Sequence, residues 1–181
     1  KRKMLRDAKS VDSIITSSPF FSDWLLSQGI KSSPVENRIS VQEKPSKPSE
    51  FTIGYFGRIR ELAAFEMLFA AVNSIEPIQR PKILIAGDGV SVQQLQQIKE
   101  ENPNLDVKIS GVFDHSDLPS MMGQISVMFA MYPPYRGNIV QGALPSKMFE
   151  AAAFGIPSIV NKDVPMGFVC ESESLGKAVI W

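Results

Sequence analysis

Short apolar runs alternate with helical segments from residue 51 onward, and this alternation restricts the fold more than any other feature of the chain. Strands that alternate with helices predict βαβ units and a parallel sheet. A parallel sheet is covered on both faces, so its strands are apolar throughout, as these runs are. We predict an α/β fold with helices on both faces of a parallel sheet. The expected strands are Phe51–Gly57, Ile83–Ala86, Val107–Ile109, Val127–Met131 and Ser158–Val160, and the expected helices include Leu62–Ile75, Val92–Ile98 and Leu118–Met122.

The stretch Ala143–Val160 combines a loop, a helix, a sharp stop and a strand. Pro145 suits the first helical position because its missing N–H has no helical partner there, and the hydroxyl of Ser146 can cap free N–H groups. Gly155 suits the left-handed position after a helix, and Pro157 prevents its continuation. This stretch therefore predicts a short helix that ends abruptly before a buried strand.

The start of this helix is a candidate anion site. Free N–H groups and the helix dipole place a partial positive charge of about half an electron there, which favours a phosphate. Lys147 lies in the first turn, where a cation opposes the dipole. Its presence makes more sense if an anion binds.

Composition excludes several classes of protein. Lys and Arg number 19 against 19 Asp and Glu, whereas a dedicated nucleic-acid binder usually carries a basic surplus. The single cysteine, Cys170, excludes an internal disulfide and is compatible with a reducing compartment. No apolar run approaches the ~20 residues of a membrane span. We interpret the start at Lys1 and the abrupt end at Trp181 as the bounds of a piece of a longer protein.

The first 50 residues are more polar and less regular. Lys1–Lys9 is a basic stretch, interpreted as a solvated helix face, with contact to an anionic membrane surface as the alternative. Val11–Thr16 indicates a strand and Pro19–Gln28 a helix that Gly29 ends. Ser32–Glu50 contains three prolines among polar residues and is the best linker candidate.

A family resemblance appears in the central stretch. The pattern L-P-x-K-x-x-E-x-x-x-x-G-x-P-x-[IV] resembles a segment of the retaining, two-domain (GT-B type) glycosyltransferases of group 1, which act in polysaccharide biosynthesis. Its seven fixed positions are Leu144, Pro145, Lys147, Glu150, Gly155, Pro157 and Ile159. The resemblance implies a Rossmann-like fold and covers residues 51–181 well and 11–38 loosely. Residues 51–181 would be the nucleotide-sugar (donor) binding domain, truncated at its C-terminus, and residues 1–50 a crossover from a missing N-terminal acceptor domain.

The resemblance also implies which residues hold the donor diphosphate. The family has Gly-Arg after the first strand of this domain, which matches Gly57 and Arg58. Glycine lets a ligand approach the backbone, and arginine can grip phosphate with two parallel N–H bonds. A lysine that many members add stands at Ala63 here, and Arg60 is the candidate to compensate for it. Arg58 and Lys147, together with the helix start near Ser146, would stabilise the departing diphosphate.

Other positions match the contacts of the nucleoside and the sugar. Val112 and Phe113 match the loop beside the base, and Glu150 matches the acid that binds the ribose hydroxyls. Many relatives carry a second acid eight residues earlier, where this chain has Gly142. Candidates for the sugar pocket are the turn Tyr132–Arg136, with Tyr132 as its candidate contact, and the backbone of Gly142, Ala143 and Leu144. The alternative for Tyr132–Arg136 is a stiff proline turn with no ligand role. The turn Gly87-Asp88-Gly89 is interpreted as structural, and His115 with Asp114 and Asp117 does not make a metal set.

The expected activity is transfer of a sugar, with retention, from a UDP- or GDP-sugar to a glycan or lipid-linked acceptor. No metal and no cofactor are expected, and no nucleic-acid partner. The expected location is cytoplasmic, with contact to the inner face of the membrane as an option for the full-length protein. Two alternatives remain open: a sugar-nucleotide epimerase of the same fold, and a non-catalytic nucleotide-binding module.

Overall fold

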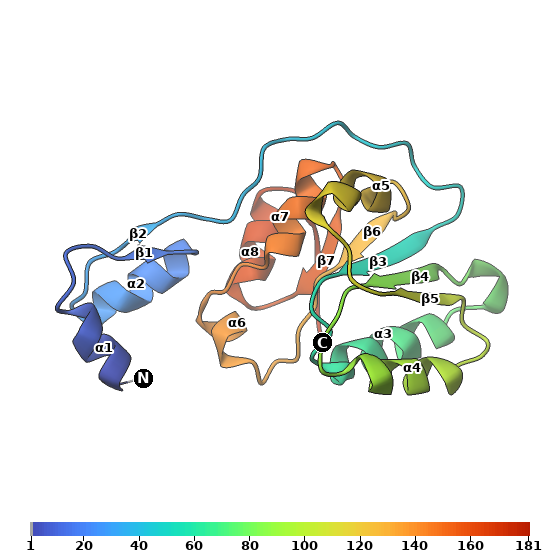
Figure 1. Ribbon diagram of the computed structural model, residues 1–181, viewed down its shortest axis with the longest axis horizontal. Coiled ribbons are helices and arrows are strands. Elements are labelled where there is room, and N and C mark those ends of the chain that lie inside the picture. The colour runs from blue at the N-terminus through green and yellow to red at the C-terminus, as the bar shows by residue number, and fades with distance from the viewer. Residues whose placement is uncertain (1) are drawn as a thin grey trace.

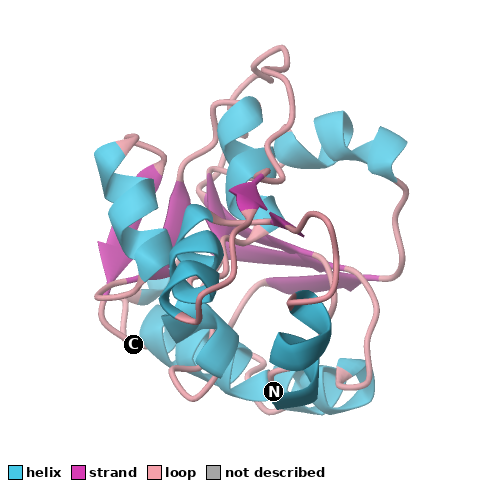
Figure 2. Ribbon diagram, turned by 90° about the vertical axis from the view of Figure 1, so that its left-hand side faces the viewer, coloured by secondary structure: helices cyan, strands magenta, loops and turns pink. Residues whose placement is uncertain are grey.

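The computed structural model describes residues 2–181, and a six-stranded parallel sheet forms its centre (Figures 1 and 2). The strand order is β5-β4-β3-β6-β7-β8, so the order reverses between β3 and β6, as in Rossmann-type sheets. This confirms the predicted fold class. The strands are β3 (Thr52–Phe56), β4 (Lys82–Ala86), β5 (Val107–Ser110), β6 (Val127–Phe129), β7 (Ser158–Asn161) and β8 (Gly176–Val179).

Helices cover both faces of the sheet because the strand side chains alternate between them. In β3, Ile53 and Tyr55 join the core cluster that contains Phe65 and Leu68 of α3, whereas Phe56 joins the cluster of Met122 on the opposite face. One face is covered by α3 (Leu62–Asn73) and α4 (Val92–Glu100), and the other by α5 (Leu118–Met122), α6 (Gly137–Gln141), α7 (Ser146–Ala153) and α8 (Pro165–Ser172).

The end of α7 follows the sequence prediction. Gly155 adopts a positive φ of 69°, its N–H donates to the carbonyl of Ala152, and the N–H of Ile156 donates to the carbonyl of Ala151, both at 2.9 Å. These two bonds make a Schellman motif, which satisfies carbonyls that the helix leaves free. The motif turns the chain directly into β7.

Residues 2–34 form a small lobe beside the main sheet (Figure 1). It contains α1 (Arg2–Ala8), β1 (Ile15–Thr16), α2 (Pro19–Ser27) and β2 (Ser33–Pro34), and β1 and β2 pair in parallel. The predicted strand Val11–Thr16 was too long, because β2 offers a partner only to its last two residues. Lys3, Arg6 and Lys9 are exposed, as expected of a solvated basic face, while Lys1 lies outside the described residues.

The linker candidate is irregular after β2, but it is packed along the domain. The guanidinium of Arg38 donates to both carboxylate oxygens of Glu173 at 2.6 and 2.8 Å and lies 4.5 Å from the ring centroid of Phe149. The N–H of Gln42 donates to the carbonyl of Ala153 at 2.8 Å. Residues 38–42 are therefore fastened to α7 and α8 before the chain reaches β3. None of the helices within residues 2–181 combines the length and hydropathy that crossing a bilayer requires.

Candidate functional site

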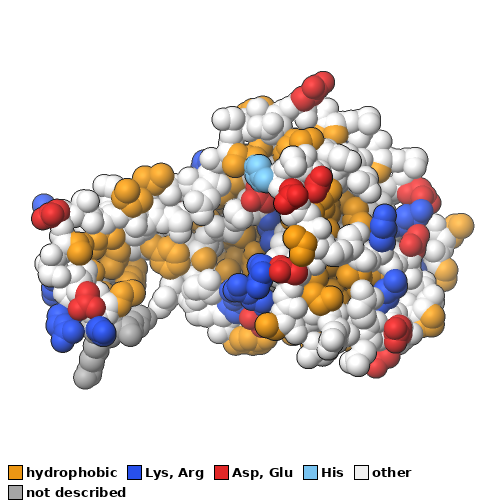
Figure 3. Space-filling model, viewed as in Figure 1, with side chains coloured by type: hydrophobic (Ala, Val, Ile, Leu, Met, Phe, Trp, Pro, Cys, Tyr) orange, Lys and Arg blue, Asp and Glu red, His pale blue; other side chains and the backbone are white. Residues whose placement is uncertain are grey.

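A pocket of about 200 Å³ lies where the strand order reverses, at the carboxyl ends of β3 and β6. Ligands of open α/β sheets bind at such points. Figure 3 shows a patch of Lys and Arg side chains on the drawn face, beside α6. The pocket brings together four predicted site residues, Arg58, Arg60, Tyr132 and Lys147. Its other lining residues are Tyr55, Glu61, Ala64, Phe65, Met131 and Arg136.

Lys147 is a buried cation in the wall of this pocket, with only 8% of the residue exposed. Its Nζ lies 3.3 Å from the ring centroid of Tyr55 and 5.6 Å from that of Tyr132. Burial lowers the pKa of Lys147 to about 7, the nearby Glu150 opposes this shift, and Arg136 adds to it. Within the described chain, no carboxylate lies within 4.0 Å of this amine. Among residues 2–181, the carboxylate of Glu150 acts on this amine only from more than 4.0 Å away.

The start of α7 differs from the prediction in one detail. The N-cap residue is Pro145, which has no side-chain acceptor, and Ser146 is the first helical residue and not the cap. Ser146 is one position too late in the chain to cap N–H groups of the first turn. Among residues 2–181, the backbone N–H groups of Ser146 and Lys147 have no hydrogen-bond partner. The helix start thus keeps free donors beside the buried amine.

Gly57 leaves room for a ligand next to this amine. Its φ is +137°, and a side-chain carbon built on it would lie 3.7 Å from Nζ of Lys147. The next residue, Arg58, is paired in the structure: its Nη1 lies 2.9 and 2.8 Å from the two carboxylate oxygens of Asp88. Both side chains are about half exposed, and such surface pairs contribute only about 0–1 kcal/mol. A diphosphate can therefore replace Asp88 at little cost.

The turn Gly87-Asp88-Gly89 has the structural role that the sequence indicated. Side-chain carbons on Gly87 and Gly89 would lie 1.9 Å from the carbonyl oxygens of Gly57 and Ile59, respectively. Only glycine permits such a close approach of two backbones. The turn therefore supports the loop that carries Arg58.

The remaining predicted residues lie outside the pocket lining. Val112 is 76% exposed, and Phe113 is half-buried with its ring edge-on to Phe56 at 6.1 Å. Glu150 is partly buried, and its charge acts on Lys147. Leu144 is buried in the core beneath α7, and Ala143 and Pro145 are partly buried.

Sequence reasoning missed two polar lining residues, Tyr55 and Glu61, whereas Arg136 belongs to the turn predicted to line the sugar pocket. Tyr55 stands in an apolar strand and looked like core, which it also is, because its ring packs edge-on against Phe65 at 4.8 Å. Its hydroxyl donates to the carbonyl of Arg58 at 2.7 Å, which fixes the loop above it. Arg136 ends its proline-rich turn, whose position over the sheet is set by tertiary contacts. The sequence feature that could have identified Tyr55 is a tyrosine in an otherwise apolar strand, two residues before the Gly57-Arg58 loop.

Comparison with known families identifies the chain. Residues 50–176 match the family model described as glycosyl transferases group 1. This chain belongs to the group 1 glycosyltransferases. The resemblance in Ala143–Val160 is thereby confirmed at the level of the family. A search of curated proteins returned no match.

Solved structures agree with the fold. A TarM variant from S. aureus, determined with fondaparinux, α-GlcNAc-glycerol and UDP, has a TM-score of 0.77 at 15% identity, covering 99% of this chain and 36% of that one. The pneumococcal O-GlcNAc transferase GtfA with UDP and GlcNAc has a TM-score of 0.72 at 18% identity over 92% and 33% of the two chains. HepE from Anabaena with UDP-glucose has a TM-score of 0.72 at 16% identity over 99% and 53%. This group 1 chain therefore spans about a third to a half of these structures.

Gly142, eight residues before Glu150, stands where the structure leaves no room for a side chain. Its φ is +121°, which side chains rarely adopt, and a side-chain carbon would lie 2.3 Å from Cβ of Phe20 and 3.4 Å from its Cα. Phe20 belongs to α2, so the N-terminal lobe occupies the space that a side chain would need. Position 142 therefore lies in the contact between α2 and α6, where only glycine fits.

Gly142→Glu is therefore expected to destabilise the fold and not to restore a sugar contact. Backbone strain and the collision near the root of the Phe20 side chain should together cost about 2–4 kcal/mol. Thermal denaturation checks this, with Gly137→Glu as the control, because a carbon on Gly137 meets nothing within 4 Å and its φ is ordinary. Equal melting temperatures for the two variants would contradict the assignment.

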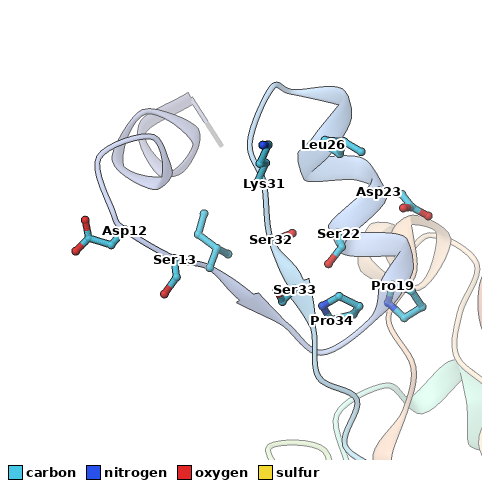
Figure 4. Close-up of a pocket in the computed structure, with 11 residues that line it drawn as sticks. Asp12, Ser13, Pro19, Ser22, Asp23, Leu26, Lys31, Ser32, Ser33 and Pro34 are labelled. Carbon is cyan, nitrogen blue, oxygen red and sulfur yellow. The ribbon is translucent and has the colours of Figure 1, made fainter.

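The N-terminal lobe has a larger cleft, of about 640 Å³, between α2 and the β1–β2 pair (Figure 4). The labelled carboxylates of Asp12 and Asp23 point away from each other (Figure 4), so these two acids do not converge on one ligand. In the described part of the chain, no three His, Cys, Asp or Glu side chains gather as a metal site would require.

Proposed function

We propose that this domain binds a nucleoside diphosphate sugar at the switch-point pocket, and that the full-length protein transfers the sugar, with retention, to a glycan or lipid-linked acceptor. UDP-glucose in the HepE structure and UDP in the TarM and GtfA structures support a UDP-sugar as the donor class. A GDP-sugar is the second donor to test.

One observation carries the proposal. Arg58 and the buried amine of Lys147 line one pocket, Gly57 presents no side chain to that amine, and the helix that carries the amine starts with two free N–H groups. These groups are all donors and cations. A diphosphate is an acceptor with two negative charges, and oriented backbone N–H groups and cations are what hold it in proteins.

The reaction places a simple electrostatic demand on the site. The bond between the anomeric carbon and the β-phosphate oxygen breaks, and its electron pair stays on that oxygen. The acceptor hydroxyl oxygen bonds to the anomeric carbon, and its proton is released. Negative charge therefore grows on the diphosphate in the transition state, where preorganised donors lower the barrier most.

Titration calorimetry of this chain with UDP and with GDP, in the presence of a chelator, tests the binding step. Saturable binding of at least one nucleotide without divalent metal is expected. Binding that vanishes with chelator and returns with Mn²⁺ would contradict the metal-free site. No binding of either nucleotide under any condition would contradict the proposed function.

A non-catalytic nucleotide-binding role is the second candidate, and Gly142 favours it because the usual sugar-contacting acid is absent. Release of free sugar or UDP from a UDP-sugar by the full-length protein separates the two. Binding with no turnover of any UDP- or GDP-sugar would support the non-catalytic role.

Glu150 is expected to act on the nucleoside. Glu150→Gln should weaken the binding of uridine and of UDP alike, by about 10- to 150-fold, because a hydrogen bond to a charged group is worth about 1.5–3 kcal/mol. In the full-length enzyme the donor KM should rise with little change in kcat, since the ribose gains no charge during transfer. Glu100→Gln on the exposed end of α4 is the control. Loss of folding in Glu150→Gln would instead mark a buried structural acid.

A further inference from the structure

Arg136 is a pocket residue with no role in the scheme above. It precedes α6 and lines the pocket with Arg58 and Lys147. Its side chain is 26% exposed, and the guanidinium carbon lies 5.2 Å from the ring centroid of Tyr132. The guanidinium is therefore held at the pocket wall, with part of its donor surface open.

Glu61 holds the loop of Arg136 in this place. One carboxylate oxygen of Glu61 accepts a hydrogen bond from the hydroxyl of Tyr135 at 3.1 Å, and the other lies 3.9 Å from Nε of Arg136. Glu61 directly precedes α3, two positions before Ala63. The loop after β6 is thus tied to the end of the loop after β3, on opposite sides of the switch point.

The charge of Arg136 acts on the same space as the buried amine. Burial raises the pKa of Tyr55 to about 12, and Arg136 opposes this shift more strongly than Arg60 does. Arg136 also opposes the burial that raises the pKa of Tyr132. These effects agree with the geometry, in which the guanidinium carbon lies 5.2 Å from the centroid of the Tyr132 ring and Arg136 lines the pocket together with Tyr55. Arg60, in contrast, lies at the rim, where its side chain is exposed.

A permanent cation matters at this position. An arginine stays charged at every pH at which proteins fold, and its planar guanidinium can donate two parallel hydrogen bonds to phosphate. Lys147 is desolvated between two rings, so its charge is costly in the empty site. Ala63 contributes no cation at the start of α3.

We propose that Arg136 is a further diphosphate-binding residue, which supplies from the β6–α6 loop the positive charge that Ala63 lacks, and that Glu61 positions it in the empty site. This inference rests on the proposed function, because it assumes that a nucleoside diphosphate occupies the pocket. The cation that binds phosphate would then come from the loop between β6 and α6, and not from position 63 in the first turn of α3.

Calorimetry with UDP and with uridine tests the assignment, because uridine lacks the phosphates. Arg136→Gln should weaken the binding of UDP by about 10- to 100-fold and leave the binding of uridine unchanged, as expected for the loss of a charge-assisted hydrogen bond. Arg136→Lys should lose less, since it keeps the charge but not the planar pair of donors. Glu61→Gln should weaken UDP only a few-fold. Lys82→Ala, at the amino end of β4, is the control.

The outcomes separate this inference from the proposed function. Wild-type chain that binds neither UDP nor GDP overturns the proposed function. Wild-type chain that binds UDP, with Arg136→Gln and Arg136→Lys both binding it equally well, overturns only the role of Arg136. Equal losses for UDP and uridine also overturn it, because a structural role would weaken both. If Arg136→Gln does not fold, Arg136→Lys decides, and wild-type UDP affinity in that variant overturns the assignment of a planar phosphate grip.

Discussion

Replacement of Lys147 by methionine is expected to weaken donor use severely and yet to stabilise the fold. In the full-length enzyme, kcat/KM should fall about 100- to 1000-fold, as when one preorganised donor is lost from an oxyanion site. The amine lies beside Gly57 in the pocket where the diphosphate is proposed to bind. Methionine keeps the length of the side chain and removes the charge.

The gain in stability follows from burial. The pKa of Lys147 is lowered from 10.5 to about 7, so between these values the unfolded chain holds a proton that the folded chain has released. In this window stability rises with pH, and the cost of the buried charge is complete at and below about pH 7. Lys147→Met should therefore gain about 1–3 kcal/mol near pH 7, after allowing for the lost contact with the Tyr55 ring. The gain should shrink toward pH 10.

Thermal denaturation of both proteins at pH 6, 7 and 9 measures this difference. Lys82→Met is the matched control, because Lys82 is about half exposed and lies at the opposite end of the sheet. A melting temperature that falls in Lys147→Met at every pH would show that the amine is a structural cation. The buried amine would then stabilise the fold. Its burial would no longer need ligand binding as an explanation.

Arg58→Ala is expected to lower UDP affinity and the kcat of the full-length enzyme together. An interaction that strengthens as charge grows on the diphosphate lowers kcat as well as kcat/KM, here by about 100-fold or more in kcat/KM. Stability should stay within about 0.5 kcal/mol, because the Arg58–Asp88 pair is half exposed. Uridine binding should not change.

Two variants make this test specific. Arg6→Ala removes another exposed arginine that pairs with an aspartate, and it should affect neither binding nor stability. Asp88→Asn removes the ion-pair partner of Arg58 in the empty site, and it should raise the affinity for UDP a few-fold. Wild-type kcat/KM in full-length Arg58→Ala would place the diphosphate grip elsewhere.

Local patterns predicted those parts of the fold that depend on local chemistry. The apolar strands, α3 and the Gly155 stop follow from side-chain alternation, helical period and the left-handed preference of glycine. The order of the strands is set by pairing between distant segments, so no local pattern contains it. The strand predicted at Val11–Thr16 failed for the same reason, because only Ile15 and Thr16 found a partner. The start of α7 was predicted one residue too early, because Pro145 is the N-cap and the helix begins at Ser146, which was expected to act as a cap.

The candidate site shows the same division. Gly57, Arg58 and Lys147 were predicted from the loops that carry them, and the structure brings these loops together. The burial of Lys147 could not be predicted, because its two rings come from Tyr55 in β3 and Tyr132 after β6. Arg136 was predicted only as the end of a turn that could line the sugar pocket. Its pairing with Glu61 could not be predicted, because Glu61 lies 75 residues earlier in the sequence. The need for glycine at position 142 could not be predicted either, because it arises from contact with Phe20 of α2.

A crystal structure of this chain with UDP is the most direct test of the central claim, that the switch-point pocket holds a nucleoside diphosphate. The account predicts phosphate oxygens within hydrogen-bond distance of Nζ of Lys147 and of the N–H groups of Ser146 and Lys147, with Arg58 released from Asp88. An ordered UDP bound elsewhere, such as the cleft of the N-terminal lobe beside Lys31, with Lys147 still enclosed by its two rings, would contradict it.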